Sequence, residues 1–205
     1  MGKRIGIYGG SFDPIHFGHL NLAIEILEAQ SLDEVWFCPA SLNPHKHLGC
    51  SANSQHRLNM LHLALEGEPR FKITEIEITR AGPSFTLDTL KEITASQKNE
   101  PDTNQFFLML GEDAARNFFK WYEPEQIIKY ARLLVGRRHT EPFKETFQGS
   151  PSIIKAIEEG LTPTRVMDVS STIVRERLAK RLYCKHLVPG KVLDYIIINR
   201  LYLNA

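Results

Sequence analysis

Six short apolar runs along the chain alternate with stretches in which apolar residues have helical spacing. The runs predict strands at 4–9, 34–40, 71–79, 106–111, 132–136 and 165–169. Between the first two, Leu20, Ala23, Ile24 and Leu27 lie on one face of a predicted helix. Alternating strands and helices are typical of a parallel sheet covered by helices on both faces. The sequence therefore predicts an α/β fold whose ligands bind beyond the carboxyl ends of the strands.

Composition and charge narrow the class of protein. The chain has 205 residues, of which 42% are hydrophobic and 24% charged, as expected for one globular domain spanning 1–205. A net charge of +1 and a pI near 7.8 give no global basic field, so we expect no nucleic acid and no membrane as partner. Three cysteines without C-x-x-C spacing, and no apolar run typical of a signal peptide or membrane span, predict a cytoplasmic protein. The oligomeric state stays open, a homo-oligomer included.

The first predicted strand runs into the sequence GGSFDPIHFGH, which combines a glycine turn with two histidines. Gly9 and Gly10 let the backbone turn tightly and approach a ligand, and Asp13-Pro14 favours a helix start. The spacing differs from G-x-G-x-x-G, which argues against a dehydrogenase. His16 and His19 lack the glutamate and the third ligand of a zinc site, so we expect them to donate to phosphate oxygens. Taken alone, the same residues also fit a glycine turn with two surface histidines.

A second candidate for anion binding lies in the sequence MDVSSTIVRERLAKR. Ser170, Ser171 or Thr172 can cap a helix there. Arg175 then lies in the first helical turn, where a cation opposes the helix dipole unless an anion binds. Backbone N–H groups, hydroxyls and the guanidinium would together bind a polyphosphate, with further positive charge from Arg177, Lys180, Arg181 and Lys185. A capped, solvated basic helix is the alternative interpretation.

Together, GGSFDPIHFGH and SSTIVR resemble the two signature motifs, (T/H)-x-G-H and (S/T)-x-x-R, of the nucleotidyltransferase superfamily. Within it, the chain is most similar to the bacterial nicotinate-nucleotide adenylyltransferases. The likeness covers nearly the whole chain and includes NPHK, HRLNML, RAGPSFTLDTL, GEDAARNFFKW and the closing LVPGKVLDYIIINRLY. It implies a Rossmann-like, doubly wound, mainly parallel sheet. It also implies direct transfer of the adenylyl group of ATP to nicotinate mononucleotide, with release of pyrophosphate and no covalent intermediate.

The resemblance assigns roles to particular residues. His16, His19 and Arg175 would be catalytic. The histidines would hold the ATP phosphates and stabilise charge that develops at the α-phosphorus, and the phosphates would favour imidazolium. ATP would bind to Gly9, Gly10, Ser11, Phe12, His16, His19, Lys46, Ser171, Thr172 and Arg175. Nicotinate mononucleotide would bind to Ser84, Phe85, Thr86, Asp113, Trp121 and Arg138. Mg²⁺ would arrive with ATP and keep most of its water shell, so we expect no metal ligands from the protein.

Three places depart from the usual sequence of that family. Asn43 replaces the first proline of PPHK, three residues before Lys46. Glu112 replaces the alanine before Asp113, which adds a carboxylate near an anionic substrate for no reason evident in the sequence. VGRRH replaces an ending of the RPG type at Arg138, which is therefore a weaker candidate on the phosphate side.

The sequence RAGPSFTLDTLKEI predicts a helix that begins near Phe85 and Thr86, after Pro83. Its free N–H groups suit the carboxylate of nicotinate better than a carboxamide, which carries N–H donors of its own. We therefore expect the acceptor pocket to prefer the acid over the amide. An ordinary surface helix capped by Ser84 and Asp88 is the alternative.

Other activities share these signatures. Adenylyltransferases that prefer nicotinamide mononucleotide or phosphopantetheine keep both motifs and differ in the acceptor pocket. A nucleotide-binding sensor without turnover is a further alternative, which the intact His16, His19, Thr172 and Arg175 disfavour.

Overall fold

A computed structural model of the chain describes residues 2–41, 51–80, 82–97, 103–138, 147–165 and 167–203, with Arg138 described by its backbone alone. At the centre of these residues lies a six-stranded sheet with the order β3-β2-β1-β4-β5-β6. The strands are β1 (Arg4–Gly10), β2 (Glu34–Pro39), β3 (Phe71–Ile73), β4 (Gln105–Gly111), β5 (Arg132–Arg138) and β6 (Leu161–Thr164). Every neighbouring pair is parallel, which confirms the predicted α/β class. The strand order reverses between β1 and β4, where doubly wound sheets bind ligands.

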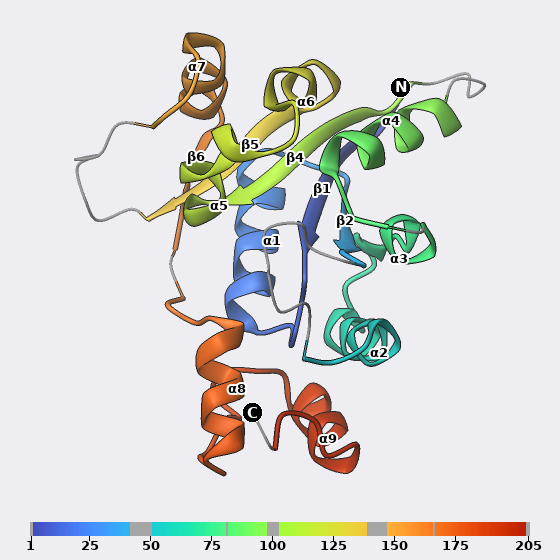
Figure 1. Ribbon diagram of the computed structural model, residues 1–205, viewed down its shortest axis with the longest axis vertical. Helices are drawn as coiled ribbons and strands as arrows, with labels where there is room; N and C mark the ends of the chain where they lie inside the picture. The colour runs from blue at the N-terminus through green and yellow to red at the C-terminus, as the bar shows by residue number, and fades with distance from the viewer. Residues whose placement is uncertain are drawn as a thin grey trace.

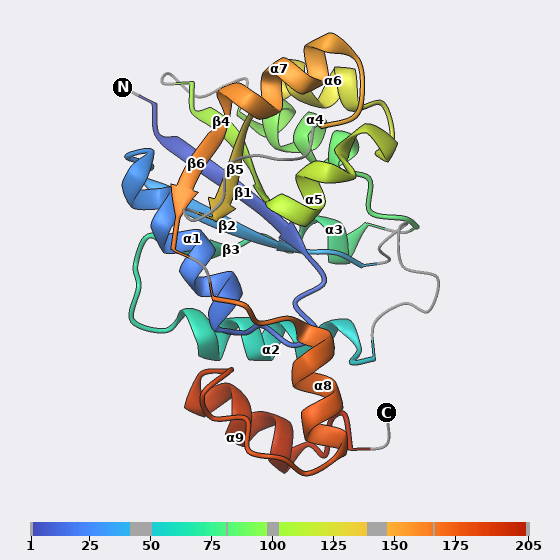
Figure 2. The same cartoon turned by 90° about the vertical axis from the view of Figure 1, so that its left-hand side faces the viewer.

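Helices cover both faces of the sheet, as predicted (Figures 1 and 2). On one side lie α1 (Phe17–Ala29), α2 (Ser54–Leu65), α8 (Ser171–Ala179) and α9 (Gly190–Ile198). On the other lie α3 (Ile76–Thr79), α4 (Thr86–Ser96), α5 (Glu112–Arg116), the 3₁₀ turn η1 (Phe118–Lys120), α6 (Pro124–Tyr130) and α7 (Pro151–Glu159). None of the helices in the described ranges is long and apolar enough to cross a membrane.

Each face of the sheet has its own apolar core. In β4, Phe107 and Met109 belong to the core under α1 and α2, whereas Leu108 and Leu110 belong to the core under α4 and α6. Successive side chains of a strand point to opposite faces, so a strand buried on both sides is apolar throughout. This explains why the central strands are continuous apolar runs in the sequence.

The strand predicted at 165–169 is wrong. The sixth strand is β6, four residues earlier, and the described residues of 165–169 form no strand. Thr162 and Thr164 are the buried positions of β6, at 0% and 3% exposed. Thr162 Oγ1 donates to the carbonyl of Gly160 at 3.2 Å, so its hydroxyl is satisfied inside the protein. A search for apolar runs misses a strand whose inward side chains are threonines.

The strand predicted at 71–79 is shorter than expected. Only β3, Phe71–Ile73, pairs with the sheet, at one of its edges. The chain then turns into α3, which brings Glu77 inward to a position that is 6% exposed. The alternation of apolar and polar residues therefore continued past the end of the strand.

Candidate active site

A cavity of about 320 Å³ opens at the carboxyl ends of β1 and β4. Gly9 and Gly10 of β1 and Gly111 of β4 line it, together with His19 of α1. Its size is typical of pockets that enclose a small ligand. The cavity lies at the reversal of the strand order, which agrees with the location expected from the sequence.

The glycine turn after β1 presents backbone to the cavity. A Cβ at Gly9 would meet no atom within 4 Å, so the turn leaves room there for a ligand. A Cβ at Gly10 would lie 2.9 Å from the ring of Phe12, so this position needs glycine for packing. Phe12 itself is 1% exposed, and its ring packs edge-on against His19 at 5.1 Å. Phe12, predicted to bind ATP, can therefore contact a ligand only through its backbone.

His16 and His19 cap helix α1 with each other's side chains. His16 Nδ1 accepts from the backbone N–H of His19, and His19 Nδ1 accepts from the backbone N–H of His16, both at 3.3 Å. The two rings stack with their centroids 3.6 Å apart. This is a capping box in which histidines take the places usually held by Ser or Thr and Glu. Because each Nδ1 is an acceptor, each neutral ring carries its proton on Nε2 and presents an N–H donor there.

Gly18 between the two histidines is required by close packing. A Cβ there would lie 3.0 Å from Nδ1 of His16 and 3.2 Å from the carbonyl oxygen of Val169. A larger residue would therefore displace the His16 ring or the segment that precedes α8. The glycine lets the two signature segments lie directly against each other.

Burial determines the charge of His16 in the protein without bound ligand. The residue is 4% exposed, and its desolvation lowers the pKa from 6.5 to about 4. The ring is thus neutral at pH 7 before any phosphate binds. The imidazolium expected beside phosphates concerns the ATP complex and stays a prediction, since burial acts in the opposite direction.

Helix α8 is capped by the first of its three candidate residues. The side chain of Ser170 accepts from the backbone N–H of Ile173 at 3.2 Å. This leaves Ser171 free for another role, and its Oγ donates to the carbonyl of Pro14 at 3.0 Å. The start of α8 is therefore fixed against the segment that leads to the histidine pair.

Arg175 makes the second link between the two signature segments. Its Nη1 donates to the carbonyl of Asp13 at 2.7 Å, across 162 positions of sequence, and its Nη2 donates to Thr172 Oγ1 at 3.3 Å. Both acceptors are uncharged, and no carboxylate in the described ranges forms an ion pair with this guanidinium. The structure thus brings together the two segments that the sequence singled out, and leaves a positive charge between them.

The other cations of this helix are placed differently. Arg177 donates from Nε and Nη2 to the carbonyl of Tyr183, at 3.2 and 2.9 Å. It closes the turn after α8, and its contribution to the charge near phosphates stays a prediction. Lys180, Arg181 and Lys185 are exposed.

Asp13 is a buried anchor, which the sequence indicated only as a turn residue. It is 2% exposed, and its carboxylate accepts from the backbone N–H groups of Ser51 and Ala52 at 2.7 and 3.1 Å. The hydroxyl of Tyr202 donates to the same carboxylate at 2.7 Å. Asp13 therefore joins the glycine turn to the segment before α2 and to the end of the described chain. No local signal marks Tyr202, because the contact spans 189 positions.

Arg57 of α2 is a second residue that the sequence did not single out. It is 1% exposed, and its Nη1 donates to the carbonyl of Ser11 at 2.8 Å. Arg57 Nε and Ser11 Oγ are both buried without a hydrogen-bond partner among the described residues. A buried cation is costly unless it is paired. The glycine turn is therefore held by the guanidinium of Arg57, which hydrogen-bonds only to backbone within the described residues.

The opposite wall of the cavity is the start of α4. The helix begins at Thr86 with Phe85 as its N-cap, which confirms the predicted position. No side chain caps its first N–H groups, and Ser84 Oγ instead accepts from the backbone N–H of Ser41 at 2.9 Å. Ser84, Phe85 and Thr86 all line the cavity. Uncapped N–H groups at this wall suit an anionic group of a ligand.

Aromatic rings and the carboxylate of Asp113 also line this side of the cavity. Trp121 and Tyr122 line it, and the ring of Tyr122 packs 5.0 Å from that of Phe85. Tyr122 is 49% exposed and was not predicted. Asp113 lines the same cavity from α5. Five of the six residues expected to bind the acceptor therefore surround one cavity: Ser84, Phe85, Thr86, Asp113 and Trp121.

Comparisons with known proteins agree with this geometry. The profile of the Cytidylyltransferase-like family matches residues 7–177. Nicotinate-nucleotide adenylyltransferase of Bacillus subtilis strain 168 is 35% identical over 204 residues, which cover 98% of each chain. The chain belongs to the nicotinate-nucleotide adenylyltransferase family.

Solved structures resemble the fold of this adenylyltransferase family member. The nicotinic acid mononucleotide adenylyltransferase of Plasmodium falciparum complexed with NaAD has a TM-score of 0.75 at 24% identity, over 98% of this chain and 97% of that chain. The same protein complexed with APC has a TM-score of 0.73 at 24% identity, with the same coverage. The likeness confirms the Rossmann-like sheet.

Glu112, which departs from the usual family sequence, is neutralised within its own helix. Arg116 Nη2 donates to Glu112 Oε1 at 2.7 Å, in an i,i+4 pair. The added carboxylate therefore has its own counter-charge on α5. The pair with Arg116 offsets the charge of Glu112, which the sequence left unexplained near an anionic substrate.

Two predicted site residues are not placed by the structure. Lys46 lies outside the described residues, as does Asn43, so its contact with ATP stays a prediction. Arg138 ends β5, where its backbone pairs with Thr164, and its side chain is not described. Within the described ranges, no group of three or more His, Cys, Asp or Glu side chains could hold a metal ion.

Proposed function

We propose that the chain transfers the adenylyl group of ATP to nicotinate mononucleotide, forming nicotinate adenine dinucleotide and pyrophosphate in NAD biosynthesis. The observation that carries the proposal is the junction of α8 with Asp13 and Pro14, beside the segment that holds His16 and His19. Similarity over the full length to relatives named for this activity supports it. We expect the reaction to take place in the cytoplasm, in keeping with the free thiols of Cys38 and Cys184.

The ATP phosphates would bind between the glycine turn and the start of α8. The turn offers space at Gly9, α8 offers the positive end of its dipole, and Arg175 offers a guanidinium with no carboxylate partner in the described ranges. The Nε2–H groups of His16 and His19 add two preorganised donors. Lys46 would reach the same phosphates from the 42–50 segment, as the family likeness implies.

The reaction requires the protein to position the two substrates and to stabilise charge, and it requires no nucleophile from the protein. The 5′-phosphate oxygen of the acceptor attacks the α-phosphorus, and the bond from that phosphorus to the oxygen bridging to the β-phosphate breaks, so pyrophosphate leaves in line. No side chain becomes covalently attached. The two histidines and Arg175 stabilise the charge on the non-bridging oxygens and the leaving group. Mg²⁺ enters as part of the substrate MgATP, with phosphate oxygens and water as its ligands.

The acceptor would lie along the wall formed by α4 and Trp121. The first N–H groups of α4 would receive the nicotinate carboxylate, and the indole of Trp121 would stack on the pyridine ring. Asp113 would hydrogen-bond a ribose hydroxyl. Because the first turn of α4 offers donors only, it should favour the acid over the amide.

An acceptor panel tests the proposal. The protein is incubated with MgATP and nicotinate mononucleotide, nicotinamide mononucleotide or phosphopantetheine, while pyrophosphate release is followed and products are identified by mass. We expect the fastest release with nicotinate mononucleotide and the mass of nicotinate adenine dinucleotide. Fastest release with phosphopantetheine would contradict the acceptor assignment, and ATP binding without release from any acceptor would indicate a sensor.

A further inference from the structure

A buried polar cluster lies behind the start of α4, on the acceptor side of the cavity. Glu77 of α3 is 6% exposed and lines the cavity together with Cys38 of β2 and Ser84 and Thr89 beside or within α4. The transfer of the adenylyl group as described makes no use of Glu77. A carboxylate in the wall of this pocket would repel an anionic acceptor, so the presence of Glu77 there requires a separate explanation.

The shortest hydrogen bonds of this cluster lead from Arg80 through Thr89 to Glu77. Arg80 Nη2 donates to Thr89 Oγ1 at 2.7 Å, and Thr89 Oγ1 donates to Glu77 Oε1 at 2.7 Å. On the other side, the backbone N–H of Ser41 donates to Ser84 Oγ at 2.9 Å, and the Ser84 hydroxyl acts on the Glu77 carboxyl to lower its pKa. Because each hydroxyl already accepts an N–H, each has its own proton left to donate. Only a group that accepts without donating fits between them, and a carboxylate is such a group.

Stability alone does not account for this arrangement. Burial raises the pKa of Glu77, and hydrogen bonds from Thr89 and Ser84 together with the charge of Arg80 offset only part of that effect. Buried charged clusters are often no more stabilising than apolar residues of the same volume. What the cluster does provide is a fixed link from β2 and α3 to the first turn of α4.

We propose that Glu77 is a positioning residue for the acceptor, because it fixes the first turn of α4 through Thr89 and Ser84. The inference rests on the proposed function, in which that turn receives the carboxylate of nicotinate mononucleotide. Thr89 Oγ1 also donates to the carbonyl of Phe85, at 3.3 Å, so without the acceptor oxygen of Glu77 the hydroxyl would be held by that longer bond alone. Phe85 is the N-cap of α4, so this change acts directly on the turn that lines the cavity.

Two variants remove the link at different atoms. Glu77→Gln keeps the shape but places an amide donor against hydroxyls that must donate, and Thr89→Val removes one of those hydroxyls. Thr89→Ser keeps the hydroxyl and serves as the matched control for Thr89→Val. Glu92→Gln controls for charge, since Glu92 pairs with Arg80 at 3.6 Å and its side chain is 54% exposed.

The measurements are KM for each substrate, kcat, and the ratio of kcat/KM for nicotinate mononucleotide over nicotinamide mononucleotide. Glu77→Gln and Thr89→Val should raise KM for nicotinate mononucleotide at least about tenfold and lower the acid-to-amide ratio, with KM for ATP within about twofold of wild type. Thr89→Ser and Glu92→Gln should resemble wild type. Should Glu77→Gln not fold, the pair at Thr89 decides the question.

The outcomes separate this inference from the proposed function. Folded variants with unchanged KM and an unchanged acid-to-amide ratio would overturn the role of Glu77 alone. Equal loss toward ATP and both acceptors would overturn it too, because that pattern indicates general damage to the fold. A wild-type protein that does not use nicotinate mononucleotide would overturn both.

Discussion

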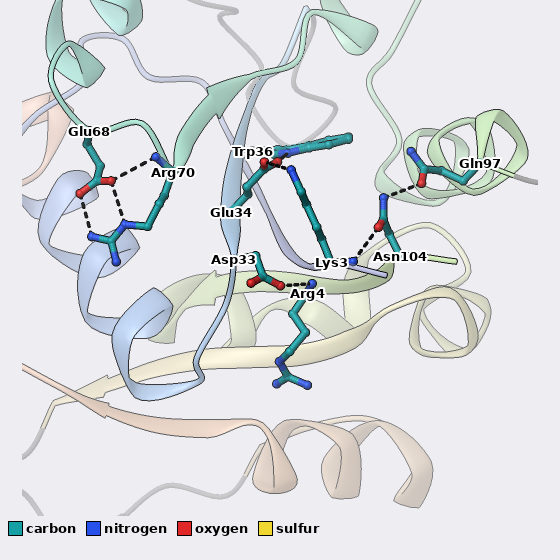
Figure 3. Close-up of polar contacts among 9 residues, drawn as sticks. All are labelled: Lys3, Arg4, Asp33, Glu34, Trp36, Glu68, Arg70, Gln97 and Asn104. Carbon is teal, nitrogen blue, oxygen red and sulfur yellow. Dashed lines mark hydrogen bonds and ion pairs between the residues drawn. The ribbon is translucent and has the colours of Figure 1, made fainter. Parts of the chain in front are cut away.

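Acidic side chains at the amino ends of the strands accept hydrogen bonds from the protein itself (Figure 3). Lys3 pairs with Glu34, and Trp36 Nε1 donates to the same carboxylate at 2.8 Å. Burial acts to raise the pKa of Glu34, but hydrogen bonds from Lys3 and Trp36 outweigh it and lower the pKa. Asp33 accepts from the backbone N–H of Arg4 at 2.7 Å. Acids at this end are thus bound to donors from the protein itself.

Near the carboxyl ends of the strands, two cations have no acidic partner in the described part of the chain. Arg57 and Arg175 donate to the backbone carbonyls of Ser11 and Asp13, and neither forms an ion pair with a carboxylate in the described part of the chain. The carboxylate of Asp13 is engaged by backbone N–H groups and Tyr202 instead. Arg4 at the amino end shares the pattern of these two cations, because its guanidinium donates to the carbonyls of Gln30 and Ser31 and to Gln105 Oε1.

The difference shows which end of the sheet is arranged for an anionic ligand. A charge that is neutralised inside the protein contributes to the fold, whereas a charge held in place by neutral groups keeps most of its field for a ligand. At the amino end, substitutions should alter stability and leave catalysis unchanged. At the carboxyl end, they should alter catalysis or ATP binding, with stability effects that follow from the hydrogen bonds lost.

The largest effect is expected for His19→Ala. Loss of one preorganised donor to developing charge should lower kcat about 100- to 1,000-fold. Because His19 Nδ1 also accepts from the backbone of His16, stability should fall by about 0.5–2 kcal/mol, as for loss of a helix cap. Steady-state kinetics and thermal unfolding measure the two effects. Ser150→Ala removes the cap of α7 and is the control, and a His19→Ala protein whose kcat matches that of Ser150→Ala would refute the catalytic role.

Arg175→Ala should raise KM for ATP at least about tenfold, because it removes a charge that faces the phosphates. Sequence reasoning alone predicts little cost in stability, since a helix-end cation is removed. The bond from Arg175 to the Asp13 carbonyl changes this prediction, and we expect a loss of about 1.5–3 kcal/mol. ATP titrations and chemical denaturation measure both, and an unchanged ATP affinity would show that Arg175 only joins the two segments.

Because of His16, the free energy of unfolding should decrease as the pH falls. The unfolded chain protonates this residue near pH 6.5, whereas burial delays protonation in the folded protein to about pH 4. Between pH 7 and pH 5 the unfolded state therefore gains about 2 kcal/mol from this group. His16→Asn keeps an N-cap acceptor without titrating, so its unfolding free energy should depend less on pH, whereas His62→Asn, at an exposed position, should behave like wild type. Parallel pH dependence in wild type and His16→Asn would contradict the buried neutral imidazole.

The smallest effect is expected at the amino end of the sheet. Glu34→Gln breaks the pair with Lys3 and weakens the contact with Trp36, and none of these three residues lines the cavity. It should lower Tm by less than Arg175→Ala does, while kcat and both KM values stay within about twofold of wild type. A clear change in KM for either substrate would contradict the expectation that residues at the amino ends of the strands affect stability and not catalysis.

Sequence patterns predicted the elements whose signal is local. The central strands and α1 follow from apolar periodicity, and the start of α4 follows from Pro83 and the helical spacing after it. The two signature segments were identified because each is a short contiguous motif. Strand β6 was missed because its buried positions are Thr162 and Thr164, whose hydroxyls find partners only in the folded chain.

The parts that sequence could not predict depend on contacts between distant residues. Asp13 meets Tyr202 across 189 positions, and Arg57 meets Ser11 across 46. The directed hydrogen bonds to Glu77 arise only when β2, α3 and α4 pack together. The reciprocal caps of His16 and His19 are local, but histidine is not a usual capping residue, so a search for Ser, Thr and Glu passes over them.

The assignment of the first turn of α4 as the carboxylate site is tested most directly by comparing two acceptors on the wild-type protein. Values of kcat/KM are measured for nicotinate mononucleotide and nicotinamide mononucleotide at saturating MgATP. The uncapped N–H groups at the start of α4 can pair fully with a carboxylate, whereas a carboxamide brings donors of its own. We predict at least about tenfold higher kcat/KM for the acid. Equal efficiency, or a preference for the amide, would contradict the assignment of this turn as the site that recognises the carboxylate.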